Sequence, residues 1–174
     1  MSNPIGDGWS VRRALPDEPE AAAVLRRYLG EMISRYYGRD TDDAEIDKHL
    51  REGHDSEDLA PPTGLLLLAY RQGVCVGCVG LRGFEAAATE AEAEPVELTR
   101  MFVAPEARGE GAAALLLAEA ERHARELGAR VIRLNTRGDL VEARALYAKH
   151  GYAEIPKFGD DPFADHWFEK TVAA

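Results

Sequence analysis

The sequence has few cysteines, no long apolar run and no basic N-terminal leader, and each shortage excludes a class of protein. Two cysteines in 174 residues cannot build a disulfide-rich secreted domain. No apolar run approaches the roughly 20 residues that cross a bilayer, so we expect no membrane span. Segment 1–20 has neither the basic start nor the apolar stretch of a secretory signal, which predicts a cytoplasmic protein.

Basic residues are also few: the sequence has 21 Lys and Arg against 31 Asp and Glu, which gives a formal net charge of -10. Such a chain repels phosphate backbones and anionic membrane surfaces, so we expect no nucleic-acid or membrane partner. The charge mildly favours a cationic partner, although acidic surfaces also serve solubility.

No metal site is expected. Cys75 and Cys78 are three residues apart on a predicted strand, where such positions project to opposite faces, so they are expected to be two small strand residues. The five histidines show no metal-binding or triad spacing.

The apolar periodicity predicts one α/β domain over residues 1–174. Helices are expected at 20–37, 42–51, 109–127 and 140–150, and strands at 10–15, 65–70, 74–82, 96–103, 131–135, 152–155 and 167–172. The order β-α-α-β-β-β-α-β-α-β-β predicts a mixed, mostly antiparallel sheet flanked by helices. In the first helix, the expected buried face consists of Leu25, Leu29, Met32 and Tyr36. The acidic, low-complexity stretch 85–95 is expected to be a solvated loop.

The segment from Arg108 to Ala113 follows a strand and opens a helix, and it has the chemistry of a pyrophosphate site. Gly109 and Gly111 let an anion approach the first helical amides, and the helix dipole and Arg108 add positive potential. A Rossmann motif would open the helix directly after its strand and have an acid about 20 residues later, and a P-loop needs Gly-Lys-Ser/Thr. Neither context is present.

This segment resembles the cofactor motif of the GCN5-related N-acetyltransferases (GNAT), which reads Arg/Gln-x-x-Gly-x-Gly/Ala. Residues 143–152, with Ala-x-x-Leu-Tyr followed by Gly-Tyr, are similar to a later helix of that family. The resemblance implies acetyl-CoA as co-substrate. The residues that it implies for cofactor binding are Met101, Phe102, Val103, Arg108, Gly109, Glu110, Gly111, Ala112 and Ala113. Leu140 stands where many members have asparagine, so Asn135 is expected to help hold the pantetheine arm instead.

The resemblance also implies direct attack of a primary amine, from a small molecule or a protein, on the acetyl thioester. Glu97 matches the general-base position of some members, and Tyr147 matches the tyrosine that protonates the leaving thiolate. Alternatively, Glu97 is a solvent-exposed carboxylate on the strand or an ion-pair partner of Arg100. Alternatively, Tyr147 only packs within the helix. Tyr36 and Tyr37 could line an acceptor pocket or belong to the helix core.

The expected partners are therefore acetyl-CoA and an amine, and the sequence leaves a homodimer open. A non-catalytic acyl-CoA sensor is the alternative function. The acceptor itself is not defined by any motif.

Overall fold

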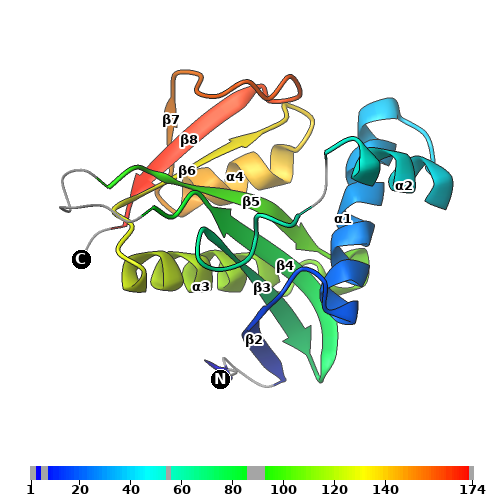
Figure 1. Cartoon of the computed structure of the whole chain (residues 1–174), viewed down its shortest axis with the longest axis horizontal. Helices are drawn as coiled ribbons and strands as arrows, with labels where there is room; N and C mark the ends of the chain where they lie inside the picture. The colour runs from blue at the N-terminus through cyan, green and yellow to red at the C-terminus, as the bar shows by residue number, and fades with distance from the viewer. Residues whose placement is uncertain (1–2, 5–7, 54–55, 86–92, 173–174) are drawn as a thin grey trace.

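The computed structural model describes residues 3–4, 8–53, 56–85 and 93–172, and it contains four α-helices around one sheet (Figure 1). The helices are α1 (Pro19–Tyr37), α2 (Asp43–Arg51), α3 (Ala112–Glu126) and α4 (Val141–Lys149), with a short 3-10 helix, η2 (Pro105–Ala107). The strands are β1 (Asn3–Pro4), β2 (Trp9–Ala14), β3 (Gly64–Arg71), β4 (Val74–Arg82), β5 (Val96–Val103), β6 (Val131–Thr136), β7 (Ala153–Ile155) and β8 (His166–Thr171). None of the helices described is long and apolar enough to cross a bilayer.

The predicted order of helices and strands is confirmed, and the described residues add the two-residue strand β1 and the 3-10 helix η2. Strands 74–82 and 96–103 have the predicted bounds. The β3–β4 hairpin turns at Gln72 and Gly73, whose φ angles of 48° and 82° are those of a type I′ turn. Residues 86–92 of the expected acidic loop lie outside the described residues.

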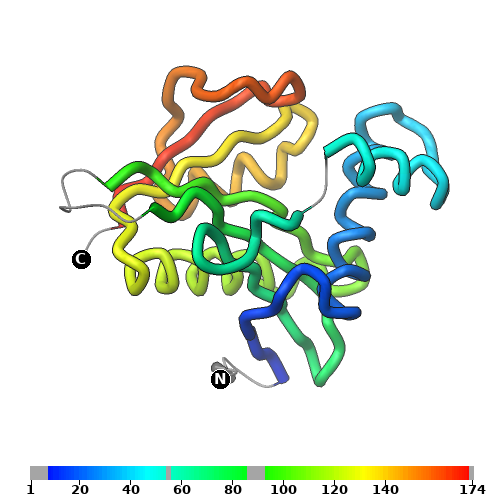
Figure 2. Tube along the Cα trace, in the orientation of Figure 1, coloured from blue at the N-terminus to red at the C-terminus, as the bar shows by residue number. Residues whose placement is uncertain are grey.

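The strands run in the order β1-β2-β3-β4-β5-β6-β8-β7, and only β5 and β6 are parallel neighbours among the described strands. These two strands pair at Val96 with Ile132 and at Glu97 with Arg133, and then they part. Figure 2 shows the result: β2 to β5 form one part of the sheet, and β6, β8 and β7 form the other. The sheet is therefore divided along much of its centre.

A β-bulge interrupts β5 close to this division. Gly80 pairs with Thr99 and Cys78 with Phe102, so Val79 alone faces both Arg100 and Met101. Arg100 absorbs the extra residue with a φ of 58°, a left-handed conformation that non-glycine residues seldom adopt. The bulge thus changes the direction of side chains in the middle of β5.

The core lies between the sheet and its helices. The run Leu65–Ala69 of β3 is fully buried, and α3 packs on β3, β4 and β5 through Leu116 and Leu117. Gly77 of β4 permits close packing, because a Cβ there would lie 2.6 Å from the carbonyl oxygen of Phe102. α1 packs on β4 and β5.

The buried face predicted for the first helix was partly wrong. In α1 the buried residues are Ala21, Val24, Leu29 and Ile33, whereas Tyr36 is 50% exposed, because the last turn of α1 lines a cavity instead of the core. The helix predicted to end at residue 127 ends at Glu126, and Leu127 is 47% exposed because the chain turns away at Gly128.

The start of α3 also differs from the prediction, which placed it at Gly109. Gly109 and Gly111 have φ angles of 81° and 88°, so residues 108–111 form a turn and the helix begins at Ala112. The N-cap residue of α3 is Gly111, which has no side chain to cap the helix, and the first amides of a helix have no partner inside it.

Candidate active site

A cavity of about 750 Å³ opens where β5 and β6 part. Its walls come from α1, β5, the end of β6, α4 and the 156–165 connection between β7 and β8. The cavity brings together most of the site residues predicted from the sequence: Glu97, Met101, Phe102, Val103, Arg108, Ala113, Asn135 and Tyr147.

The turn that leads into α3 forms one end of the cavity. Arg108 Nε donates to the carbonyl oxygen of Val103 at 2.9 Å, and its Nη2 lies 2.7 Å from both carboxylate oxygens of Glu31. Arg108 therefore joins β5, the turn and α1. Its charge is paired with Glu31, so the positive potential of this turn comes mainly from the amides of α3.

The other predicted cofactor residues, Gly109, Glu110, Gly111 and Ala112, lie at the N-terminus of α3 beyond the lining of this cavity. A Cβ added at Gly109 or Gly111 would meet no atom within 4 Å, so the space around both glycines is open. The Glu110 carboxylate forms an ion pair with Arg71 of β3. This pairing directs the Glu110 side chain to β3 and leaves the amides of the turn accessible.

Tyr147 of α4 is 5% exposed and lies in the cavity wall. Its ring packs against Tyr152 and Phe168, with centroids 5.8 Å and 6.2 Å away. Burial raises the pKa of the Tyr147 phenol well above its ordinary value of 10. The phenol is therefore neutral at physiological pH, which is the form that can donate a proton.

Glu97 lines the cavity and has a cross-strand partner that the sequence did not suggest. It faces Arg82 of β4, whose Nη2 lies 3.0 Å from Glu97 Oε1 and whose Nε lies 3.2 Å from Oε2. The expected alternative partner, Arg100, instead donates to Thr99 Oγ1 and Ser56 Oγ, both at 3.2 Å. The Arg82 pair fixes the orientation of the Glu97 carboxylate at the cavity wall.

Several cavity residues had no role in the sequence motifs. Tyr28 of α1 packs edge-to-face on Phe102 at 6.3 Å, and burial raises the pKa of its phenol. Tyr36 packs edge-to-face on Phe163 with centroids 5.0 Å apart, and the Arg137 guanidinium lies 5.6 Å from the centroid of the Tyr36 ring. The aromatic pair joins α1 to the 156–165 connection, two segments that no short motif could relate.

The two cysteines are free: Cys78 is buried and Cys75 is partly buried. Burial raises the pKa of both thiols. Within the described ranges, no group of three His, Cys, Asp or Glu residues has the arrangement of a metal site.

One cavity of this α/β fold thus has a parted parallel strand pair and a buried phenol in its walls, and an open glycine turn lies beside it at the N-terminus of α3. A model of the Acetyltransferase (GNAT) family matches residues 27–152. The chain is 37% identical over 143 residues to the IAA acetyltransferase of Azospirillum brasilense, covering 82% of this chain and 85% of the relative. It is 32% identical over 146 residues to the uncharacterized N-acetyltransferase YjgM of Escherichia coli, covering 83% and 81%.

A solved structure gives the same fold. The PaiA N-acetyltransferase of Thermoplasma acidophilum, crystallised in complex with coenzyme A, superposes with a TM-score of 0.69 at 20% identity, covering 94% of this chain and 98% of that one. The chain belongs to the GNAT acetyltransferase family, and it is an acetyltransferase.

Proposed function

We propose that the chain transfers the acetyl group of acetyl-CoA directly to an amine bound in the cavity between β5 and β6. The observation that carries the proposal is the division of the sheet. Among the described strands, none pairs with the β6 side of β5 beyond Glu97, so the main chain of Met101 to Val103 is open to a ligand at the cavity wall.

The residues present fit acetyl-CoA in two places. The main chain of Met101 to Val103 would pair with the amides of the pantetheine arm as a further strand would, with Asn135 on the opposite wall. The amides at the start of α3 would hold the pyrophosphate, because Gly109 and Gly111 have open space where other residues carry a Cβ. Acetyl-CoA supplies a thioester whose carbonyl carbon an amine can attack.

Two side chains are proposed to move protons. The acceptor must be neutral to attack, and an alkylamine has a pKa of about 10, so a carboxylate that takes its proton directly or through water assists at neutral pH. Glu97, oriented by Arg82, has this role. Tyr147, held neutral by burial, donates a proton to the sulfur as the carbon–sulfur bond breaks.

Calorimetric titration with acetyl-CoA, followed by an assay of CoA release with a panel of amines, tests the proposal. We expect saturable binding and amine-dependent release of CoA. Tyr147→Phe should lower kcat by roughly 100-fold or more, the usual contribution of a general acid, with the Kd for acetyl-CoA little changed. Binding without CoA release for any amine would instead support the sensor alternative, and no binding would contradict the proposed cofactor site.

A further inference from the structure

The arginines in the wall of the cavity are already engaged by other groups of the protein. Three ion pairs join two residues that both line the cavity: Arg35 with Glu142, Arg82 with Glu97, and Arg108 with Glu31. Arg137 pairs with Asp139, and Arg100 donates to the hydroxyls of Ser56 and Thr99. A carboxylate on the acceptor would therefore have to displace one of these partners, which is costly for a desolvated charge.

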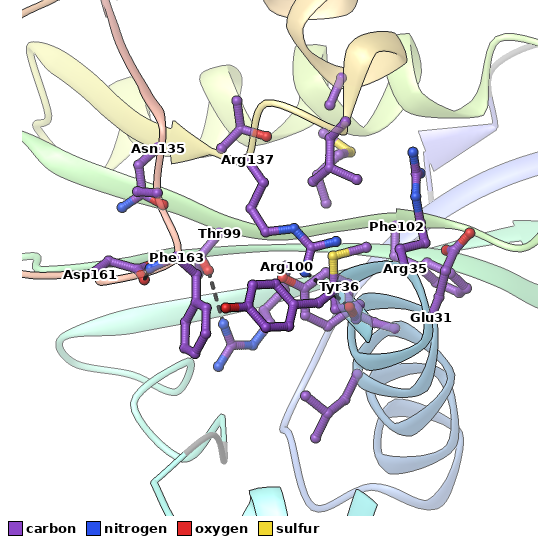
Figure 3. Close-up of a pocket in the computed structure, with 18 of the residues that line it drawn as sticks. Glu31, Arg35, Tyr36, Thr99, Arg100, Phe102, Asn135, Arg137, Asp161 and Phe163 are labelled. Atoms are coloured by element: carbon purple, nitrogen blue, oxygen red, sulfur yellow. Dashed lines mark hydrogen bonds between the residues drawn. The ribbon is translucent and has the colours of Figure 1, made fainter. Parts of the chain in front are cut away.

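Tyr36, in the last turn of α1, presents an aromatic ring to the same cavity. The residue is 50% exposed, although its ring is held from three sides. Tyr37 and Phe163 meet it edge-to-face, each with its centroid 5.0 Å away, and the Arg137 guanidinium lies 5.6 Å from its centroid. Figure 3 shows Tyr36 beside Phe163 and below Arg137. A ring that is fixed in place and still half open is suited to bind a ligand.

The apolar surface extends from Tyr36 in both directions. Met32 lies one helical turn earlier on the same face of α1, and it also lines the cavity. Phe163 continues the surface on the 156–165 connection. Such a wall binds the uncharged body of a ligand by removing it from water, and aromatic rings add favourable contacts with a further ring.

An acidic side chain lies next to this wall. Asp161 lines the cavity, and its Oδ1 accepts a hydrogen bond from the amide of Phe163 at 2.9 Å, which places the carboxylate beside the aromatic pair. Its negative charge favours an ammonium group over a carboxylate as the incoming ligand. The formal net charge of -10 acts in the same sense at longer range.

We propose that the acceptor is a small primary amine whose amine is its only charged group and whose aromatic body packs on Tyr36 and Phe163. An arylalkylamine is the simplest member of this class. The proposal rests on the proposed function, because it names the acceptor of that same reaction. The nitrogen bonds to the acetyl carbon as the carbon–sulfur bond breaks, and it loses one proton while the sulfur gains one, which yields an N-acetyl amide and CoA.

A set of related amines tests the proposal in the unmodified protein. CoA release is measured at one pH with 2-phenylethylamine, ethylamine, phenylalanine and 1,4-diaminobutane. Ethylamine lacks the ring, phenylalanine adds a carboxylate, and the diamine replaces the ring with a second ammonium group. We expect kcat/KM to be roughly 10- to 100-fold higher for 2-phenylethylamine than for each of the others, the range expected for burying one aromatic ring. An equal or higher value for any of the other three would overturn the proposal.

Tyr36→Ala assigns the preference to this wall. The variant should lower kcat/KM for 2-phenylethylamine roughly 10-fold more than for ethylamine, whereas Tyr36→Phe keeps the ring and should keep the preference. Leu127→Ala removes an apolar side chain of similar exposure, 47%, outside the cavity lining, and should also keep it. Urea unfolding checks that the variants are folded. An equal loss with both amines in Tyr36→Ala, or the same change of preference in Leu127→Ala, would contradict the role of Tyr36.

Titration with acetyl-CoA separates this proposal from the proposed function. If acetyl-CoA binds and ethylamine or the diamine is acetylated as well as 2-phenylethylamine, the proposed function stands and the aromatic acceptor is wrong. If acetyl-CoA does not bind, the proposed function fails, and the acceptor proposal fails with it.

Discussion

Gly111 and Gly128 lie just beyond the two ends of α3, and they offer a matched pair of substitutions. Both have a φ of 88°, and a Cβ added to either would meet no atom within 4 Å. Alanine at either position therefore changes the backbone energy without a steric clash. Only Gly111 lies beside the amides that we propose for the pyrophosphate.

The expected magnitudes follow from this geometry. An L-residue in the left-handed region costs about 1–2 kcal/mol, so Gly111→Ala and Gly128→Ala should lower the free energy of unfolding by similar amounts. For a chain of this length, each kcal/mol corresponds to a decrease in Tm of about 2–4 °C. Gly111→Ala should in addition weaken acetyl-CoA binding by about 1.5–3 kcal/mol, or roughly 10- to 150-fold in Kd, because its methyl group would stand where we propose that a phosphate oxygen meets an amide.

Urea unfolding of both variants and calorimetric titration of both with acetyl-CoA provide the test. The unfolding experiment checks that the two substitutions have matched effects on the fold, and the titration measures the difference that belongs to the ligand. Equal Kd values for the two variants would refute the placement of the pyrophosphate at the N-terminus of α3, whatever the effect on stability.

Three further predictions concern residues around the site. Leu116→Ala should lower the free energy of unfolding by about 2–5 kcal/mol in a urea titration, because the side chain is fully buried; a loss below 1 kcal/mol would contradict its packing. Tyr152→Phe removes a 3.2 Å hydrogen bond to the buried Glu121 and should cost about 1.5 kcal/mol by the same measurement, whereas unchanged stability would show that this bond contributes nothing. Burial and then the Arg13 charge lower the pKa of His123 below 6.5. As the pH falls below 6.5, His123 takes up its proton in the unfolded chain before it does so in the folded chain, so the free energy of unfolding decreases. Urea unfolding at about pH 7 and pH 5 should show that His123→Gln loses less stability between the two pH values than the unmodified protein does. An equal decrease in both proteins would contradict this.

The elements and the glycine turn before α3 could be predicted from the sequence because their signals are local. The apolar run of β3, the hairpin at Gln72 and Gly73 and the glycines before α3 each lie within a few residues of what they determine. The first helix shows where local signals fail. The spacing of Tyr36 fits a buried face, and periodicity cannot distinguish a face that meets the core from one that lines a cavity.

The cavity side chains that come from β5 and from the 156–165 connection depend on tertiary pairing and could not be predicted in the same way. The bulge at Arg100 exists because Val79 faces two residues of β5, which is a property of the register between two strands. The Glu97–Arg82 pair follows from the same register. The contact of Tyr36 with Phe163 joins segments more than 100 positions apart, so only the folded chain brings them together.

The short pairing of β5 with β6 has a mechanical consequence. Two residue pairs connect β5 and β6. At the cavity, α1 also links to the β6 side of the sheet, because Arg137 donates to the carbonyl oxygen of Met32 and Arg35 pairs with Glu142 of α4. A small rotation about the closed end would widen or narrow the gap without breaking either half. A ligand that contacts both halves would restrict this rotation. The distance between the halves would then differ between the free and the ligand-bound protein.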